Sequence, residues 1–377
     1  MTTSTLDRPA ARTYPAYSRP LWRRALLTRE FAVIALLVAV LFYSNNNVAN
    51  FDSPLTMYYL FLDIAPILLI ALPMTMIIIT GEIDLSVASV VGLSSVLVGV
   101  LHQDAGMSIP VAGAIAILVG AVCGAFNGFL VAYVGLPSLA VTIGTLALYR
   151  GIAVGLLGTK AVTDFPEKWT DLAKERITEG SSYPMILVPF IVLAIVFTAL
   201  LHFSPFGRGV YEIGLNDEAA HFSGVDVERT KFWLFVMAGA VSALAGIYYT
   251  LRFGSARGDN ATGLELQVIA AVLLGGVSIF GGRGALHGVI AGAILIGVIS
   301  SAMRLESYTV NVINIVIGTL LVLSVMSTSL LAWAQGQLAR RRRRSSAPPI
   351  SEHVSEHSSE PGRRRQAAAT TDSTNER

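Results

Sequence analysis

Long apolar stretches separated by short polar breaks fill the chain between Phe31 and Trp333. A helix needs about twenty mostly apolar residues to cross the hydrocarbon core of a bilayer, and fewer where neighbouring protein shields its ends. The pattern therefore predicts an all-α integral membrane protein with about ten transmembrane helices. The predicted helices cover residues 31–49, 58–80, 86–102, 109–133, 137–158, 184–203, 231–251, 264–280, 286–303 and 309–333.

The composition agrees with a bilayer as the main solvent. Of the 377 residues, 53% are hydrophobic and 14% are charged, whereas soluble domains carry about a quarter charged residues. The positive charge gathers at the two ends, in Arg23, Arg24 and Arg29 before the first apolar stretch and in residues 340–344 after the last. Basic residues beside membrane helices favour the cytoplasmic side and its lipids. Nucleic-acid binding is the weaker explanation, because no aromatic or groove-reading element accompanies the arginines.

Both termini are therefore predicted to be cytosolic, which an even number of spans allows and which also places Arg208 and Lys231 in the cytosol. Residues 1–28 and 335–377 lack the apolar periodicity that a folded core requires and are expected to be disordered, the second as a basic cytosolic tail. Residues 29–334 form the predicted membrane domain. Its polar loop at 159–183 falls outside the cell, carries a predicted amphipathic helix near 167–177, and offers a docking surface.

Two polar or glycine-rich strings interrupt the apolar pattern. One is GEIDLSVAS at 81–89, and the other holds Gly275, Gly276 and the glycines of 281–284. Glycine accepts backbone conformations that end a helix, and broken helices in membranes line cavities. A parallel or inverted internal repeat is one hypothesis for the two breaks, although the halves show no residue-level match.

The sequence gives little support to an enzyme. No Walker A loop is present, and the four lysines, Lys160, Lys168, Lys174 and Lys231, lie outside any nucleotide-binding motif. The six histidines show no metal-ligand spacing, and no nucleophile motif of the Ser/His/Asp type occurs. We therefore expect no catalytic residues, no metal and no cofactor.

The cytosolic loop at 204–230 has the character of a docking element. Residues 210–222 are predicted to form one short helix, with a flat face at Ala219 and Ala220 and with Glu212, Asp217 and Glu218 offered to a partner. Gly224 suits the turn that ends it. A helix lying on the membrane surface would favour Lys and Arg on its polar face, so docking into a groove of a cytosolic protein is preferred.

This loop resembles the EAA-type loop of ABC importer permeases. The resemblance becomes specific through four blocks: GEIDLSVAS at 81–89, NGFLVAYVGLPSLAVTIGTLALYRG at 127–151, GRGVYEIG at 207–214 and GLELQVIAAVLLGGVSIFGGRGALHG at 263–288. Together they resemble the permease family of ribose, xylose, arabinose, galactose, rhamnose and autoinducer-2 importers, from about Arg24 to Thr328. The first two blocks look closer to the rhamnose-type branch than to the ribose type.

The resemblance implies a permease subunit that translocates a monosaccharide, of the rhamnose type or another pentose or hexose, across the bacterial plasma membrane. Its implied partners are cytosolic ATPase subunits that bind the ATP, an external sugar-binding protein, and a second permease in a homodimer or heterodimer. The residues implied in coupling to the ATPase are Arg208, Tyr211, Glu218, Ala219, Ala220 and Gly224.

Five polar residues are candidates for the translocation path: Glu82, Asp84, Ser86, Asn127 and Thr142. They can exchange hydrogen bonds with sugar hydroxyls, and carboxylates in or near a membrane need partners or a wet cavity. Asp84 and Ser86 have an alternative role as caps of the following helix. A different class of protein, a proton-coupled secondary sugar transporter, would use Glu82 or Asp84 as its proton carrier, but it needs no docking loop for an ATPase.

Overall fold

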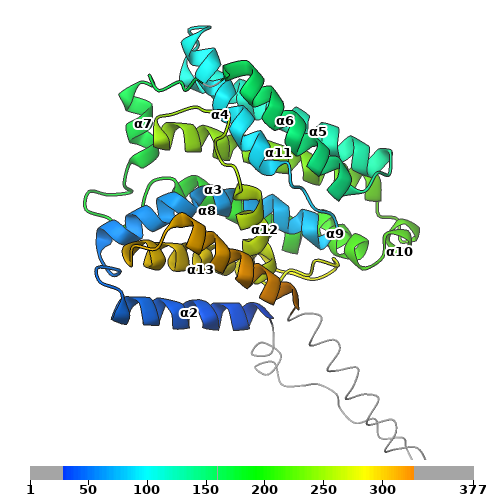
Figure 1. Ribbon diagram of the computed structural model, residues 1–377. Coiled ribbons are helices and arrows are strands. Elements are labelled where there is room, and N and C mark those ends of the chain that lie inside the picture. The colour runs from blue at the N-terminus through cyan, green and yellow to red at the C-terminus, as the bar shows by residue number, and fades with distance from the viewer. Residues whose placement is uncertain (1–28, 159, 327–377) are drawn as a thin grey trace, which may run out of the picture. The chain divides into compact units, whose positions relative to one another are not determined.

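The computed structural model describes residues 29–158 and 160–326, and helices account for most of them (Figure 1). The predicted tails at 1–28 and 335–377 lie outside the described residues. The named helices are α2 (Arg29–Asn47), α3 (Pro54–Ile79), α4 (Val87–Gln103), α5 (Ile109–Gly128), the π-helix η1 (Phe129–Tyr133), α6 (Ser138–Leu157), α7 (Glu167–Lys174), α8 (Leu187–Phe203), α9 (Pro205–Leu215), α10 (Asp217–Phe222), α11 (Val227–Phe253), α12 (Leu264–Leu274) and α13 (Leu286–Leu305).

Six helices of the described chain are long and apolar enough to cross a membrane, namely α2, α3, α5 with η1, α6, α11 and α13. The pair α8 and α9, bent by 67°, makes a seventh if it is counted as one span. Three further apolar helices, α4, α12 and Val310–Met326, are shorter. The predicted all-α multi-pass fold is confirmed, and every predicted span contains an apolar helix. Within the predicted span at 264–280, helix α12 ends at Leu274, directly before the glycine-rich break that the sequence predicted.

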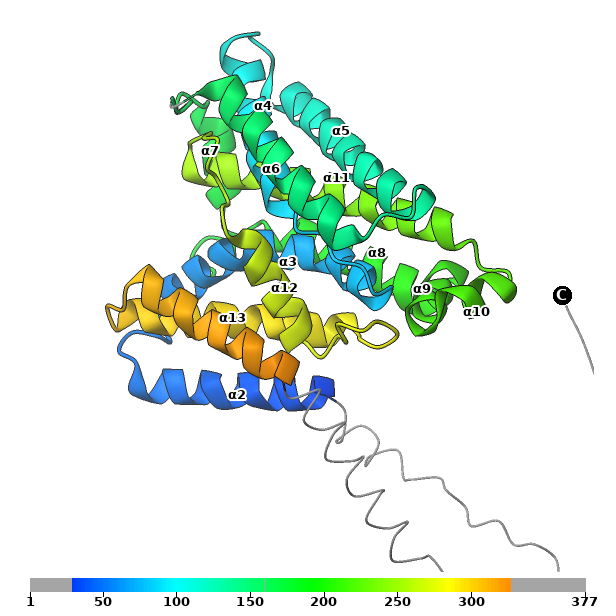
Figure 2. The same cartoon turned by 45° about the vertical axis from the view of Figure 1, so that its right-hand side comes forward.

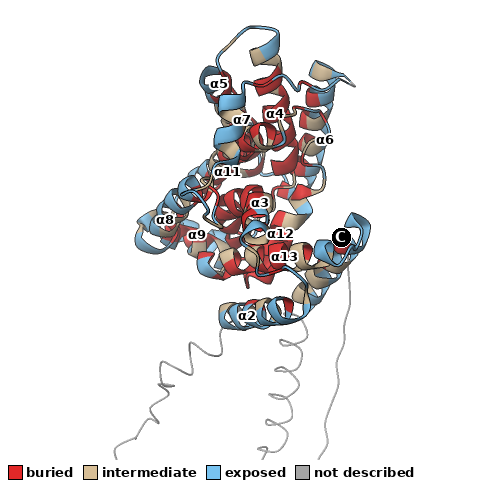
Figure 3. Ribbon diagram, turned by 90° about the vertical axis from the view of Figure 1, so that its left-hand side faces the viewer, coloured by how far each residue is buried: buried red, intermediate tan, exposed pale blue. Residues whose placement is uncertain are grey.

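Helix α3 lies at the centre of this assembly. All of its residues from Ile64 to Ile79 are buried, and it packs against α8, α11, α12 and α13 (Figure 3). The outward faces of α5, α6 and α8 are apolar and exposed, as at Leu118, Ile143 and Ile195. A core that is apolar inside and an envelope that is apolar outside are what a lipid solvent requires.

Small residues bring α5 and α11 into backbone contact. A Cβ added at Gly124 would lie 2.1 Å from the carbonyl oxygen of Phe235, and one added at Gly120 would lie 2.6 Å from that of Gly239. Close approach through glycine is the usual way in which membrane helices gain van der Waals contact. The two helices therefore pack backbone against backbone at Gly124, and at Gly120 the Cβ of Ala243 is the one side-chain atom as close as the backbone.

The two long loops lie at opposite ends of α11. Helix α7, within the predicted amphipathic segment, packs beside the carboxyl-terminal half of α11, where Trp169 and Leu172 share a pocket with Tyr248 and Leu251. Helix α10 precedes the amino-terminal end of α11, and Figures 1 and 2 both show α7 and α10 far apart. This arrangement agrees with one loop on each side of a membrane.

Candidate functional site

The two interruptions predicted from the sequence meet in space. Helix α3 ends at Ile79 and is followed by a non-helical segment, residues 80–86, that leads into α4. A second non-helical segment, 275–285, joins α12 to α13. The backbone N–H of Gly282 donates a hydrogen bond of 2.8 Å to the carbonyl of Ile79. The expectation of broken helices is therefore correct, and the breaks support each other.

Asp84 is buried in the first segment, with 1% of its surface exposed. Its Oδ1 accepts hydrogen bonds from the backbone N–H of Ser86 at 2.9 Å and from the Ser86 hydroxyl at 2.6 Å. Ser86 occupies the N-cap position of α4, but its side chain makes no capping bond. Neither residue therefore acts as the predicted side-chain cap of α4. Asp84 instead fixes the turn that leads into the helix.

The pKa of Asp84 reflects this burial. The residue lies in the segment between α3 and α4, outside both helices, and loss of water raises the pKa of its carboxyl group to about 6, against the opposing effect of the two hydrogen bonds from Ser86.

Asn127 and Thr142 attach the same segment to α5 and α6. The Asn127 side-chain amide donates to the Ser86 hydroxyl at 2.8 Å. The Thr142 hydroxyl lies within hydrogen-bonding distance of the carbonyls of Ser138, at 2.8 Å, and Ile83, at 3.2 Å. Asn127 and Thr142 are fully buried. Four of the five path candidates thus bind protein groups and brace the segment, and only Glu82 lines the neighbouring pocket.

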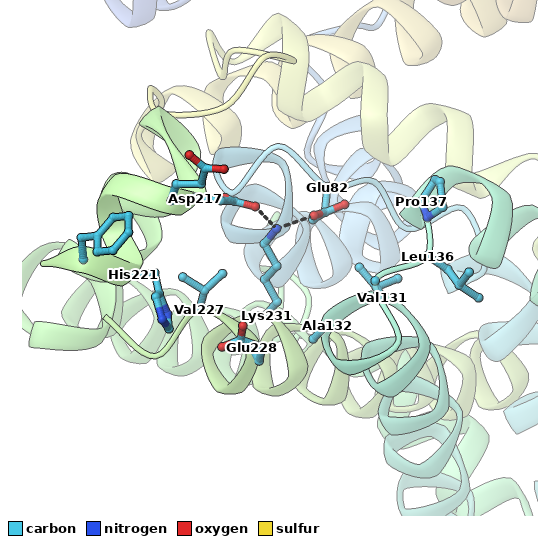
Figure 4. A pocket seen from close by; sticks show the side chains of 13 residues that line it. Glu82, Val131, Ala132, Leu136, Pro137, Asp217, His221, Val227, Glu228 and Lys231 are labelled. Carbon is cyan, nitrogen blue, oxygen red and sulfur yellow. Dashed lines mark hydrogen bonds and ion pairs between the residues drawn. The ribbon is translucent and has the colours of Figure 1, made fainter. Parts of the chain in front are cut away.

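Glu82 forms an ion pair that sequence reasoning missed. The Lys231 ammonium lies 2.7 Å from Glu82 Oε1 and 2.7 Å from Asp217 Oδ2, so one cation joins two carboxylates. Figure 4 shows Lys231 reaching from α11 between Asp217, the first residue of α10, and Glu82. A signal was available, since Lys231 is the only one of the four lysines that lies outside residues 160–174.

A cavity of about 680 Å³ opens beside this ion pair. Its charged lining is mostly acidic, with Glu218 and Glu228 in addition to the three residues of the ion pair. The remaining lining comes from Val131, Ala132, Gly135, Leu136, Pro137, His221, Phe222 and Val227. Within residues 29–158 and 160–326, no group of three or more His, Cys, Asp or Glu side chains is arranged to hold a metal ion.

The predicted single helix at 210–222 is wrong, because Asn216 divides it into α9 and α10. Asn216 is extended, with φ of −169°, and its side-chain oxygen accepts a 2.7 Å hydrogen bond from the N–H of Ala219. This is an N-cap for α10. The expected face of two alanines is also wrong: Ala220 packs with Ile213 and Val227, and only Ala219 is exposed.

The other predicted coupling residues divide into outer and inner groups. Arg208 and Glu218 are exposed, and Gly224 has φ of +92°, which fits the predicted turn. Tyr211 points inward and donates a 2.8 Å hydrogen bond to the carbonyl of Gly284. Helix α9 therefore contacts the second interruption directly, while α10 reaches the first through Lys231.

At Gly214, helix α9 lies exceptionally close to the backbones of Ile79 and Gly282. A Cβ at this position would lie 1.8 Å from the carbonyl oxygen of Ile79 and 2.4 Å from the nitrogen of Gly282. No side chain fits there without displacement of backbone. The end of α9, the end of α3 and the glycine-rich segment thus share one point of backbone contact.

Comparison with known proteins identifies the family. Residues 56–336 match the family described as "Branched-chain amino acid transport system / permease component". The chain belongs to this family. It is therefore a multi-pass membrane permease, a component of a transport system.

The similar curated proteins include three with the name "Autoinducer 2 import system permease protein LsrD". The protein from Salmonella typhi is 33% identical over 315 residues, which cover 82% of this chain and 93% of the relative. The protein from Yersinia enterocolitica is 32% identical over 320 residues, with coverages of 83% and 93%. The protein from Photorhabdus temperata is 33% identical over 310 residues, with coverages of 80% and 91%. No solved structure matches the chain.

Proposed function

We propose that this chain is the permease subunit of an ABC importer for a small, hydroxyl-rich compound, either a monosaccharide or autoinducer 2. The observation that carries the proposal is the similarity to autoinducer-2 permeases over nine-tenths of their length. The sequence blocks that resemble sugar permeases support the same class. The family description names branched-chain amino acids instead, so the substrate class requires a direct test.

The proposed partners follow from the two long loops, which lie at opposite ends of α11. Cytosolic ATPase subunits, which bind the ATP, dock on α9 and α10, where Arg208, Glu218 and Ala219 are exposed. An external binding protein docks on the 159–183 loop around α7. A second permease subunit, identical or different, completes the translocation path. In this arrangement both termini are cytosolic and the protein resides in the bacterial plasma membrane.

Glu82 is the proposed path residue among the five candidates, because it lines the cavity and its carboxylate can exchange hydrogen bonds. Asp84, Ser86, Asn127 and Thr142 support the path by holding the segment that carries Glu82. Weak interactions are sufficient, since the external binding protein supplies the affinity and a tight site would trap the ligand. Among substrates, autoinducer 2 is the first compound to test, and rhamnose, favoured by the sequence motifs, is the second.

The decisive experiment is uptake by cells that express the complete transporter. Radiolabelled autoinducer 2, L-rhamnose, D-ribose and L-leucine are compared, with and without a protonophore while the ATP level is held constant. We expect accumulation of at least one of the first three compounds, no accumulation of leucine, and no loss with the protonophore. Uptake of leucine alone would contradict the substrate class. Uptake that collapses with the protonophore while ATP remains high would identify a proton-coupled secondary transporter.

A further inference from the structure

Lys231 occupies a position that no sequence motif explains. It lies one turn into α11, and its side chain is 10% exposed, whereas those of its partners Glu82 and Asp217 are 17% and 51% exposed. The three residues come from three separate elements. Glu82 belongs to the segment before α4, and Asp217 begins α10, the helix proposed to meet the ATPase.

We propose that Lys231 is the positioning residue that transmits movement of α10 to the Gly81–Ser86 segment, by holding Asp217 and Glu82 on one ammonium group. The inference rests on the proposed function and assigns a residue to its energy coupling. Lysine suits the task because its ammonium is compact and its three donors have no fixed plane. It can retain one carboxylate while its distance to the other changes.

Charge and burial make the two contacts interdependent. Two carboxylates that share one cation repel each other when the cation is withdrawn, and a part-buried carboxylate left unpaired is costly. A displacement of Asp217 therefore changes the electrostatic energy of Glu82. Because Asp217 is the most exposed of the three, it is the member that an external partner can reach first.

The Gly81–Ser86 segment carries the displacement further. Ile83, next to Glu82, donates its backbone N–H to the hydroxyl of Ser138, and its carbonyl accepts a hydrogen bond from the hydroxyl of Thr142; both partners belong to α6. Asp84 is tied through Ser86 to Asn127 of α5. A movement of Glu82 therefore acts on α6 through Ile83 and on α5 through Asp84 and Ser86. The outer faces of both helices are apolar and suit contact with lipid.

The test uses the full transporter, purified with its ATPase subunits and reconstituted in proteoliposomes. Lys231→Met removes the charge and keeps a side chain of similar length, Lys231→Arg restores a cation, and Arg229→Met removes an exposed cation two positions away on the same helix. Transport of radiolabelled autoinducer 2 and L-rhamnose is measured together with ATP hydrolysis. For Lys231→Met we expect hydrolysis within about twofold of the wild type and about tenfold less compound moved per ATP. Arg229→Met should match the wild type, and Lys231→Arg should recover part of the loss.

A second measurement follows the segment itself. Hydrogen exchange of the amides of residues 81–86 is compared in the ATP-bound and ADP-bound complexes. The wild type should show a nucleotide-dependent difference that Lys231→Met and Asp217→Asn both lack. Asp217→Asn interrupts the same link at a side chain that is 51% exposed, so this variant should fold normally even if Lys231→Met does not. The double variant Asp217→Asn/Lys231→Met should be no worse than Lys231→Met alone, since both changes interrupt one link.

The outcomes separate this inference from the proposed function. A nucleotide-dependent difference that persists in Lys231→Met, or losses that add in the double variant, would overturn the role of Lys231. A wild-type complex that hydrolyses ATP but moves neither compound would contradict the proposed substrate class. In that case the hydrogen-exchange comparison still decides whether Lys231 links α10 to the segment.

Discussion

Helices α9 and α10 are adjacent in the chain but are attached to the membrane domain in opposite ways. At Gly214, α9 lies directly against the backbone of Ile79 and Gly282, so its position is fixed by shape. At Asp217, α10 is held by an ion pair to Lys231, so its position is fixed by charge. A backbone contact tolerates almost no displacement. An ion pair near water weakens gradually with distance and can exchange partners.

The difference indicates that α9 and α10, although adjacent, have different roles. The α9 contact is suited to keep that helix in place, and the α10 contact is suited to move. Asn216 makes this possible, because its extended backbone separates the two helices. The following predictions test the two attachments, beginning with the largest expected effect.

Gly214→Val should abolish transport through loss of the folded protein. Its side chain would have to displace the carbonyl of Ile79, and overpacking of this kind costs about 1–3 kcal/mol or more. The measurement is the membrane level of the variant and its thermal stability in detergent. Gly151→Val in α6 is the matched control, because a Cβ there meets no atom within 4 Å. Normal amounts of the Gly214 variant would show that α9 is not held by shape.

Glu218→Lys should leave the membrane level normal and reduce uptake severely. The side chain is exposed on α10, so the fold does not depend on it, but reversal of its charge changes the surface proposed to meet the ATPase. Co-purification of the ATPase and uptake of the radiolabelled substrate are measured together. Full uptake with an intact complex would remove α10 from the docking surface.

Glu82→Gln should reduce uptake by about tenfold while the ATPase still assembles with the permease. The variant keeps the shape of the side chain and, among the ion pairs of the described residues, leaves the Lys231 ammonium with Asp217 as its single carboxylate partner. Glu228→Gln, which removes another acid from the same cavity, is the control and should have a smaller effect. Equal effects would mean that only the total charge of the cavity matters.

Asp84→Asn should have the smallest effect on uptake, because the asparagine carbonyl oxygen can accept the same hydrogen bonds from Ser86. Its effect on stability depends on pH. The folded pKa of about 6 lies above the ordinary value of 3.8, so the folded protein binds more protons between these values and loses stability as the pH rises through that window. The variant should therefore gain stability relative to the wild type at pH 7, by up to about 3 kcal/mol, and much less at pH 4. Thermal melts at both pH values measure the gain, and an equal gain at both would show that the carboxyl group is not perturbed.

The sequence predicted the apolar helices well because their signal is local. Predicted residues 58–80 correspond to α3 and 86–102 to α4, and the glycines after Leu274 marked a real end of a helix. The division at Asn216 also had a local signal, because an asparagine followed by two acidic residues is typical of a helix start.

The partners of the polar residues could not be predicted in the same way. Glu82 and Lys231 are 149 positions apart, and Ser86 and Asn127 are 41 apart. A single sequence contains the donors and acceptors but not their pairing, which depends on how the helices pack. The candidate path residues were therefore found as a set, whereas their separation into one cavity-lining residue and four bracing residues required the structure.

The glycine contact between α5 and α11 has a mechanical consequence. Helices whose backbones touch cannot slide past one another in small steps, so α5 and α11 behave as a single stiff lever. At 27 residues, α11 is about 40 Å long, and a tilt of about 5° shifts one end relative to the other by about 3.5 Å. The amino-terminal end of α11 is joined to α10, and its carboxyl-terminal half packs against α7. A displacement of α10 would thereby move the end of α11 that packs against α7, with no change in the length of any helix.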